Sequence, residues 1–279
     1  MQHASQNWVG VLILDVLVAV AILISILWAR LGRKLYIRRI PGLNAIDEAI
    51  GRATEMGKPI IMVPGVGGLD VISLQALTVF SHITRAAARF NNRILLPVAD
   101  STLYTVAEEV IRGVYDAEGR PERFDQDSVR YLSSEQFAYA SGVAGLIQRE
   151  KVAACFHFGY FAAESLIFAE SGNQVGAIQV AGTTQTTQIP YFIAACDYTI
   201  IGDEYYAASA YISREPTLLG SLIGQDIGKM LIMLLIVLGV AAATLHTHLG
   251  GANVPEAWEP VDKYLRDYLY KLFDVAVVQ

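Results

Sequence analysis

The sequence predicts an α/β fold, with a doubly wound, mostly parallel Rossmann-like sheet of about six strands. From residue 59 onward, short apolar runs alternate with segments of helical periodicity, and the runs lack the polar alternation of half-exposed strands. Strands of this kind are buried on both faces, so the helices between them must cover both sides of one sheet. Right-handed crossovers then produce the doubly wound arrangement.

The expected strands and helices follow one another regularly along the chain. A first helix is expected over residues 44–56, where apolar residues recur at helical spacing. Ser133 and Gln136 have the spacing of a capping box that opens a helix, and Gly172 is expected just beyond a helix end. Strands are expected at 59–63, 94–98, 128–132, 152–158, 175–180 and 198–201, with helices between them at 70–90, 101–114, 133–150, 161–170 and 190–195.

An apolar run from Trp8 to Trp28 precedes this domain. About 20 apolar residues are enough to cross the hydrocarbon core of a bilayer as a helix. The charges follow the run rather than precede it, which predicts a retained signal-anchor and not a cleaved signal peptide. These basic residues favour the cytoplasmic side, and they are Arg30, Arg33, Lys34, Arg38 and Arg39.

A second long helix is expected from about Thr217, with an apolar part from Met230 to Leu245 that returns the chain across the membrane. The predicted organisation is therefore a signal-anchor with its basic flank, a cytoplasmic α/β domain, a second transmembrane helix and an extracytoplasmic tail containing an amphipathic helix. Their expected bounds are 1–39, 40–216, 217–249 and 250–279. This places the protein in the cell (inner) membrane, in contact with membrane lipid, with both termini outside.

Two features of the expected spans point to packing between helices. Gly220, Gly224 and Gly228 form a stripe that lets another helix backbone approach closely, either from the first span or from another subunit. The alternative is that these glycines only loosen the helix start. Asp15 lies inside the first span, where a carboxylate is costly. We expect it to hydrogen-bond in an oligomer or to stay near the wet interface, rather than to relay protons or ions.

Composition and motifs exclude several functions. A formal net charge of −6 argues against nucleic-acid binding, and 53% hydrophobic residues fit a chain with membrane segments. Cys155 and Cys196 have no metal-binding spacing and are expected to be reduced. His246 and His248 lack a third ligand nearby, so we expect no metal there. The sequence contains no P-loop, no Gly-x-Ser-x-Gly elbow, no His-Glu-x-x-His and no Cys-x-x-Cys, and it implies no particular cofactor.

A weak candidate for a ligand site lies at the carboxyl ends of the expected strands, where parallel sheets bind ligands. The turn after the first strand is rich in glycine and opens a helix, although Asp70 stands where a dinucleotide fingerprint would have its third glycine. A run of uncharged polar residues follows the fifth strand and suits a sugar, a carboxylate or another subunit's backbone, or it is simply a solvated loop. The candidate residues are Gly65, Gly67, Gly68, Asp100, Ser101, Thr183, Thr184 and Gln185. His157, inside a strand, is expected to be a satisfied core side chain.

The stretch from Arg39 to Pro59 reads RIPGLNAIDEAIGRATEMGKP. It resembles the opening of a family of bacterial and archaeal membrane-anchored proteins that is catalogued as a domain of unknown function. The resemblance implies the same layout, with an anchor, an α/β domain and a second span, and it carries no catalytic residues.

These observations lead to two hypotheses about function. The first is a membrane-anchored, homo-oligomeric scaffold or structural subunit of a larger membrane assembly, without evident catalysis. It depends on the glycine stripe, Asp15, the aromatic residues of the expected tail helix and the lack of a catalytic constellation. The second is an enzyme or a protein that binds a small ligand, such as a nucleotide or sugar phosphate, in the strand-end crevice.

Overall fold

The computed structural model describes residues 8–31, 41–213 and 215–249. The expected amphipathic tail, 250–279, lies outside the described residues, as do the side chains of His246 and His248. The chain divides into two compact units: Ile37–Arg214 form one, and Met1–Tyr36 together with Glu215–Gln279 form the other.

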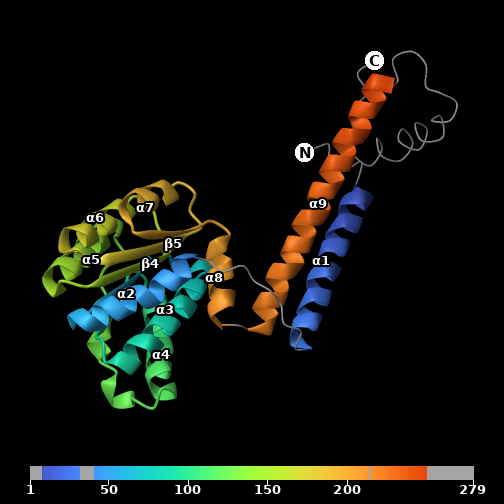
Figure 1. The fold of residues 1–279 in the computed structure, drawn as a ribbon. Helices are drawn as coiled ribbons and strands as arrows, with labels where there is room; N and C mark the ends of the chain where they lie inside the picture. Colours follow the sequence, from blue (N-terminus) through green and yellow to red (C-terminus); the bar gives the residue numbers. More distant parts are fainter. Residues whose placement is uncertain (1–7, 32–40, 214, 250–279) are drawn as a thin grey trace. The chain divides into compact units, whose positions relative to one another are not determined.

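The α/β unit contains a six-stranded sheet with the order β3-β2-β1-β4-β5-β6, and every neighbouring pair is parallel (Figure 1). The order reverses between the two central strands, β1 and β4, as a doubly wound sheet requires. The predicted fold class is therefore confirmed for this unit. The strands are β1 (Ile60–Gly65), β2 (Ile94–Val98), β3 (Val129–Tyr131), β4 (Ala154–Tyr160), β5 (Ile178–Thr183) and β6 (Tyr198–Ile201).

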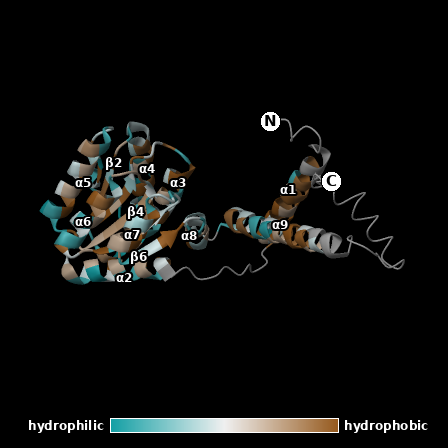
Figure 2. Cartoon of the chain, turned by 90° about the horizontal axis from the view of Figure 1, so that it is seen from above, coloured by the Kyte–Doolittle hydropathy of each residue, from teal (hydrophilic) through white to brown (hydrophobic). Residues whose placement is uncertain are grey.

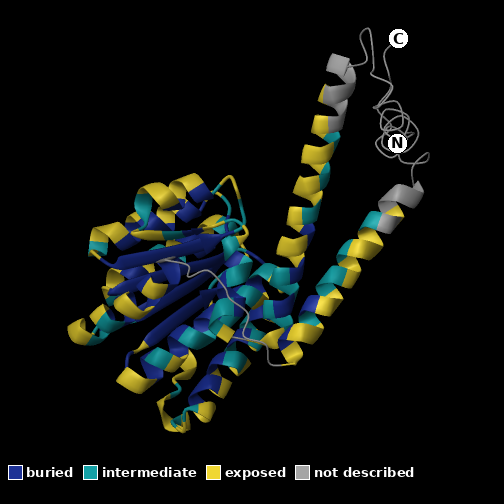
Figure 3. Cartoon of the chain, turned by 45° about the vertical axis from the view of Figure 1, so that its right-hand side comes forward, coloured by how far each residue is buried: buried dark blue, intermediate teal, exposed yellow. Residues whose placement is uncertain are grey.

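Helices cover both faces of the sheet, and each face has its own apolar core. One core packs the sheet against α2 (Pro41–Met56), α3 (Val71–Phe90), α4 (Ser101–Ala117) and α8 (Glu204–Ser213). The other packs it against α5 (Gln136–Glu150), α6 (Ser165–Val175) and α7 (Ile189–Ala195). Figure 3 shows the strands buried between these layers. Both strand faces are covered, which explains the unbroken apolar runs in the sequence.

Aspartate side chains fix the start of two helices near the carboxyl ends of the strands. Oδ1 of Asp70 accepts a hydrogen bond from the Ser73 backbone N–H at 2.7 Å. Oδ1 of Asp100 accepts one from the Leu103 backbone N–H, also at 2.7 Å. Each carboxylate satisfies an amide that has no partner within its helix, and its negative charge suits the positive helix N-terminus.

Several local predictions were wrong. The capping box does not form, because Ser133 Oγ accepts from the N–H of Glu135, which itself precedes the helix α5. Gly172 lies inside α6 rather than beyond it, and Gly176 ends that helix in a left-handed conformation. Helix α8 was not predicted at all, and α4 continues to Ala117, three residues beyond its expected end.

The second unit contains two long helices, α1 (Trp8–Arg30) and α9 (Pro216–Leu249), which pack against each other (Figure 1). Figure 2 shows apolar residues along both helices. Among the described residues, one stretch, Pro216–Ala241, is long and apolar enough to cross a membrane. The expectation of two membrane-crossing helices is thus supported for α9 alone, and for α1 it stays a prediction.

The glycine stripe of α9 faces α1 of the same chain. A Cβ atom placed on Gly220 would lie 2.5 Å from the Cα of Ile26, and one on Gly224 would lie 2.5 Å from the Cα of Ile22. At Gly228 the nearest atom would be Cγ1 of Val18, at 3.3 Å. The partner numbers fall as the glycine numbers rise, so the two helices run antiparallel. The glycines therefore serve close packing within the chain.

We expect Gly65→Ala to destabilise the α/β unit by about 1–3 kcal/mol or more, because Gly65 has a left-handed φ of 80° and its new Cβ would overlap the carbonyl oxygen of Tyr160. Gly113→Ala on α4 is the matched control, since a Cβ there meets no atom within 4 Å. The control should be neutral or stabilising by up to about 1 kcal/mol. Thermal unfolding of the full chain, followed by circular dichroism, measures both. Equal melting temperatures for the two variants would contradict the strained turn.

Candidate functional site

The candidate ligand residues lie at the carboxyl edge of the sheet, on three loops. Gly65 ends β1, Gly67 and Gly68 follow it, and Asp100 precedes α4 with Ser101 as the first residue of that helix. The structure brings the first two loops together, because a Cβ on Gly68 would lie 4.0 Å from Cγ of Asp100. Thr183 ends β5, and Thr184 and Gln185 follow it in the third loop. Thr183 Oγ1 donates to the carbonyl oxygen of Gly159 on β4 at 3.0 Å.

Backbone contacts bridge the point between β1 and β4 where a doubly wound sheet normally opens a crevice. The Val66 N–H donates to the carbonyl oxygen of Tyr160 at 3.0 Å, beyond the last paired strand residue. Gly159 has a φ of 150°, and a Cβ there would overlap the carbonyl oxygen of Pro64. Glycine at 65 and at 159 is therefore needed for two backbones to approach closely, rather than to leave room for a phosphate.

The polar atoms at this edge are largely engaged within the chain. The carboxylates of Asp70 and Asp100 cap their helices, and Thr183 Oγ1 also accepts from the Gln185 N–H at 3.2 Å. The Ser73 hydroxyl beside Gly67 is the exception, because it is buried with no hydrogen-bond partner among the described atoms. This geometry gives the predicted ligand site little support, and it stays a prediction.

A fully buried carboxylate, Glu164, stands at the same edge, between β4 and α6. Its two oxygens accept from Gln136 Nε2 at 2.6 Å and from the Ala162 N–H at 2.9 Å. Glu164 precedes the first turn of α6, and Gln136 is the first residue of α5, so the negative charge lies near two helix N-termini. No local sequence pattern shows that Glu164 is buried or that it ties two helices together.

His157, in the middle of β4, is fully buried in an aromatic cluster. Its ring stacks on Phe168 and Phe192, with centroid distances of 6.1 and 5.9 Å. Nε2 lies 3.2 Å from Oε1 of Gln179, while the Gln179 amide nitrogen donates to backbone oxygens, including that of Ala169 at 2.8 Å. The acceptor Oε1 therefore requires the hydrogen on Nε2, and Nδ1 has no hydrogen-bond partner among the residues that the structure describes. The prediction of a satisfied core histidine is half right.

We expect His157 to weaken the fold in acid. Burial lowers the pKa of its imidazole from 6.5 to about 4, against the opposing effect of the Gln179 hydrogen bond. Below pH 6.5 the unfolded chain therefore binds a proton at His157 that the folded chain does not bind. The free energy of unfolding is unaffected by this group above pH 6.5 and falls as the pH decreases towards 4. The loss amounts to about 3 kcal/mol at most.

Urea unfolding of the full chain between neutral pH and about pH 4 measures this effect. His157→Phe should be less stable at neutral pH, because Gln179 Oε1 loses its donor, but its stability should fall less with pH than that of the wild type. His82→Gln is the control, since His82 is half-exposed and lies 3.8 Å from Asp47. It should retain most of the wild-type fall. Parallel pH profiles for wild type and His157→Phe would disprove the assignment.

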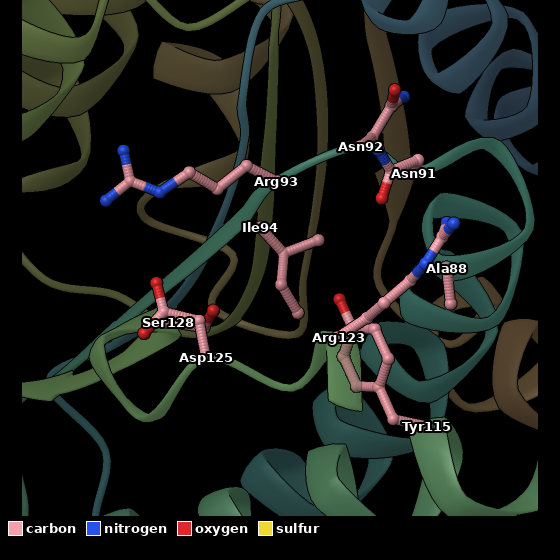
Figure 4. Close-up of a pocket in the computed structure, with 9 residues that line it drawn as sticks. All are labelled: Ala88, Asn91, Asn92, Arg93, Ile94, Tyr115, Arg123, Asp125 and Ser128. Carbon is pink, nitrogen blue, oxygen red and sulfur yellow. The ribbon is translucent and has the colours of Figure 1, made fainter. Parts of the chain in front are cut away.

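A pocket of about 140 Å³ lies at the opposite edge of the sheet, beside the start of β2 (Figure 4). It is formed by the end of α3, the end of α4 and the loop before β3, which contains two short 3₁₀ turns, Pro121–Arg123 and Gln126–Ser128. No sequence motif predicts this pocket, because its lining comes from three separate segments of the chain. The lining residues are Ala88, Asn91, Asn92, Arg93, Ile94, Tyr115, Arg123, Asp125 and Ser128.

The other candidate chemistry finds no support in the described part of the chain. No group of three His, Cys, Asp or Glu side chains there is placed to hold a metal ion. Cys155 and Cys196 are both free thiols. Burial raises the pKa of Cys155 far above its usual value and that of Cys196 to about 12, so neither is activated as a nucleophile.

Comparison with known proteins gives one result. A family model described as a domain of unknown function (DUF6754) matches residues 1–253. No curated protein and no solved structure matches the chain.

Proposed function

The chain belongs to the DUF6754 family, and we propose that it is a membrane-anchored subunit that assembles with copies of itself, with its α/β domain on the cytoplasmic side. The apolar surface of the helix pair α1/α9 supports an anchor. Large apolar side chains cover the faces that the two helices turn away from each other, which is typical of contact with lipid. They include Leu12, Val16, Val20, Leu23 and Leu27 on α1, and Met230, Met233, Ile236, Val237 and Val240 on α9.

The charges beside the helix pair support the orientation. Arg30 at the end of α1 donates from Nη2 to Thr217 Oγ1 of α9 at 3.4 Å. The end of α1 and the start of α9, which both connect to the α/β domain, are therefore at the same end of the helix pair. Four more basic residues follow Arg30 within ten positions, whereas no Lys or Arg follows the apolar part of α9 until Lys263. An excess of basic residues at one end of a span holds that end on the cytoplasmic side.

Exposed acids on the helix pair carry the proposal of assembly. The antiparallel register set by the glycine contacts places Asp226 of α9 level with Val20, in the middle of the apolar α1. Asp15 is placed level with Leu231. Both carboxylates are exposed on this helix pair. A charged side chain facing lipid at this depth costs about 2.5–3.5 kcal/mol, so such residues face other protein or water. A second copy of the chain, packed against these faces, would supply the missing contacts.

The α/β domain acts in this proposal as a rigid body rather than as a catalytic centre. Its strand-end aspartates cap helices, and its strand-end glycines serve backbone packing, as described above. The α/β domain is connected to α1 at its start and to α9 at its end, and attachment through two helices suits a structural role. Because Arg30 contacts Thr217, both connections begin at the same end of the helix pair.

The orientation can be measured with a single reporter cysteine. We expect Glu122→Cys, in the exposed loop before β3, to react with a membrane-impermeant maleimide only after cells are opened. The background is a variant with Cys196→Ser, since Cys155 is buried. A reporter at Asn253, beyond α9, should react in intact cells. Labelling of Glu122→Cys in intact cells would invert the proposed orientation.

The assembly can be measured by native mass spectrometry of the full chain extracted in mild detergent. We expect a multiple of the 30.4 kDa chain mass. Asp15→Leu and Asp226→Leu should each shift the distribution towards the monomer, because leucine suits lipid but cannot hydrogen-bond to a partner helix. Val16→Leu on α1 and Val237→Leu on α9 are the controls, since both residues are exposed and apolar, and they should leave the assembly intact.

Two outcomes would count against the assembly. A wild-type chain that is monomeric in native membrane patches as well as in detergent would refute it. If both aspartate variants assembled like the wild type, the oligomer would have to use another surface, and the two acids would have no part in it.

A further inference from the structure

The pocket beside the start of β2 brings groups of opposite charge to one small cavity. Figure 4 shows Tyr115 and Arg123 on one side of Ile94, with Asp125 and Ser128 on the other. The volume of about 140 Å³ is close to the ~150 Å³ of an engineered protein cavity that holds one benzene molecule. The floor is apolar, from Ile94 and Ala88, and the rim is polar. Such a cavity suits a small metabolite with one cationic and one anionic group.

The backbone around the pocket is held by contacts that do not use its charged rim. Nη1 of Arg120 donates to the carbonyl oxygens of Ala88 at 2.7 Å and of Arg89 at 3.1 Å, which ties the loop to the end of α3. The Asn92 amide donates from Nδ2 to Thr54 Oγ1 at 2.7 Å. Phe124 packs against Tyr115, with 6.0 Å between ring centroids. The walls are therefore formed before any ligand arrives.

Several polar groups that line the pocket remain available to bind a ligand. Within the described α/β unit, the ion pairs include neither Arg123 nor Asp125, and the Ser128 hydroxyl makes no hydrogen bond. Asp125 uses Oδ1 to accept from the Asp127 N–H at 3.0 Å, which leaves its second carboxylate oxygen. Burial raises the pKa of Tyr115, Asp125 raises it further and Arg123 opposes them, so the phenol stays protonated and can donate.

We propose that this pocket binds a small free α-amino acid. Arg123 would hold the carboxylate, with the phenol of Tyr115 and the amide of Asn91 as further donors. Asp125 and the hydroxyl of Ser128 would hold the ammonium group. The apolar floor formed by Ile94 and Ala88 would contact the carbon atoms between the two charges. Neither charge alone explains the site, because an anion would be repelled by Asp125 and an amine by Arg123. This site is independent of the assembly proposed above.

Isothermal titration of the full chain in detergent with glycine, L-alanine and L-serine tests the proposal. We expect saturable binding at millimolar concentrations or below. Acetate and propionate lack the ammonium group, and methylamine and ethylamine lack the carboxylate, so each should bind at least tenfold more weakly than alanine. Arg123→Gln and Asp125→Asn should each weaken alanine binding at least tenfold. Asparagine can still accept the Asp127 N–H, so Asp125→Asn keeps the turn.

Two controls separate the pocket from a general charge effect. Asp127→Asn removes a carboxylate from the same loop without touching the lining, and Arg149→Gln removes an exposed cation from α5. Both should bind alanine like the wild type, and all variants should melt like the wild type. Absence of binding in the folded wild type overturns the proposal. Acetate binding as tight as alanine binding, or unchanged alanine binding in Asp125→Asn, also overturns it and leaves a simple anion site.

Discussion

The parallel ladder between β1 and β4 is the contact on which the rest of the α/β unit depends. These strands pair from Ile60 opposite Ala154 to Val63 opposite His157, and then shift register before Gly65 meets Tyr160. Both strands are at the centre of the sheet, and β1 and all but the last residue of β4 are buried. Each apolar core uses one face of this ladder, so both helical layers are positioned by it.

The same ladder determines which surfaces are left for function. It continues to the ends of both strands, so backbone groups occupy the place where doubly wound sheets usually admit a ligand. The nearby aspartates are needed as helix caps, and Glu164 is buried between two helix N-termini. Exposed binding groups are found instead at the opposite edge, around Arg123 and Asp125, and exposed acids lie on the α1/α9 pair. Function is therefore proposed at these two places.

Much of the α/β unit could be predicted, because strand and helix periods are local. β2 and β6 have the predicted bounds, and Asp70 opens α3 as its position suggests. The errors have tertiary causes. Glycine at 172 suggests a helix end, but its missing side chain instead lets Gln179 of β5 pack against α6. The sequence of α8 has no amphipathic pattern, and only the packing of Tyr205 and Ala208 on the sheet identifies it as a core helix.

The sequence by itself determined the class of the sheet, the order of its elements, the position of two apolar helices and the presence of a glycine stripe. Each of these depends on residues close together in the chain, whose spacing reports one local conformation. The tertiary structure alone decided that the stripe meets α1 of the same chain, that β1 and β4 close the expected crevice and that a pocket forms beside β2. Those results depend on contacts between distant segments, and local spacing carries no record of which segments meet.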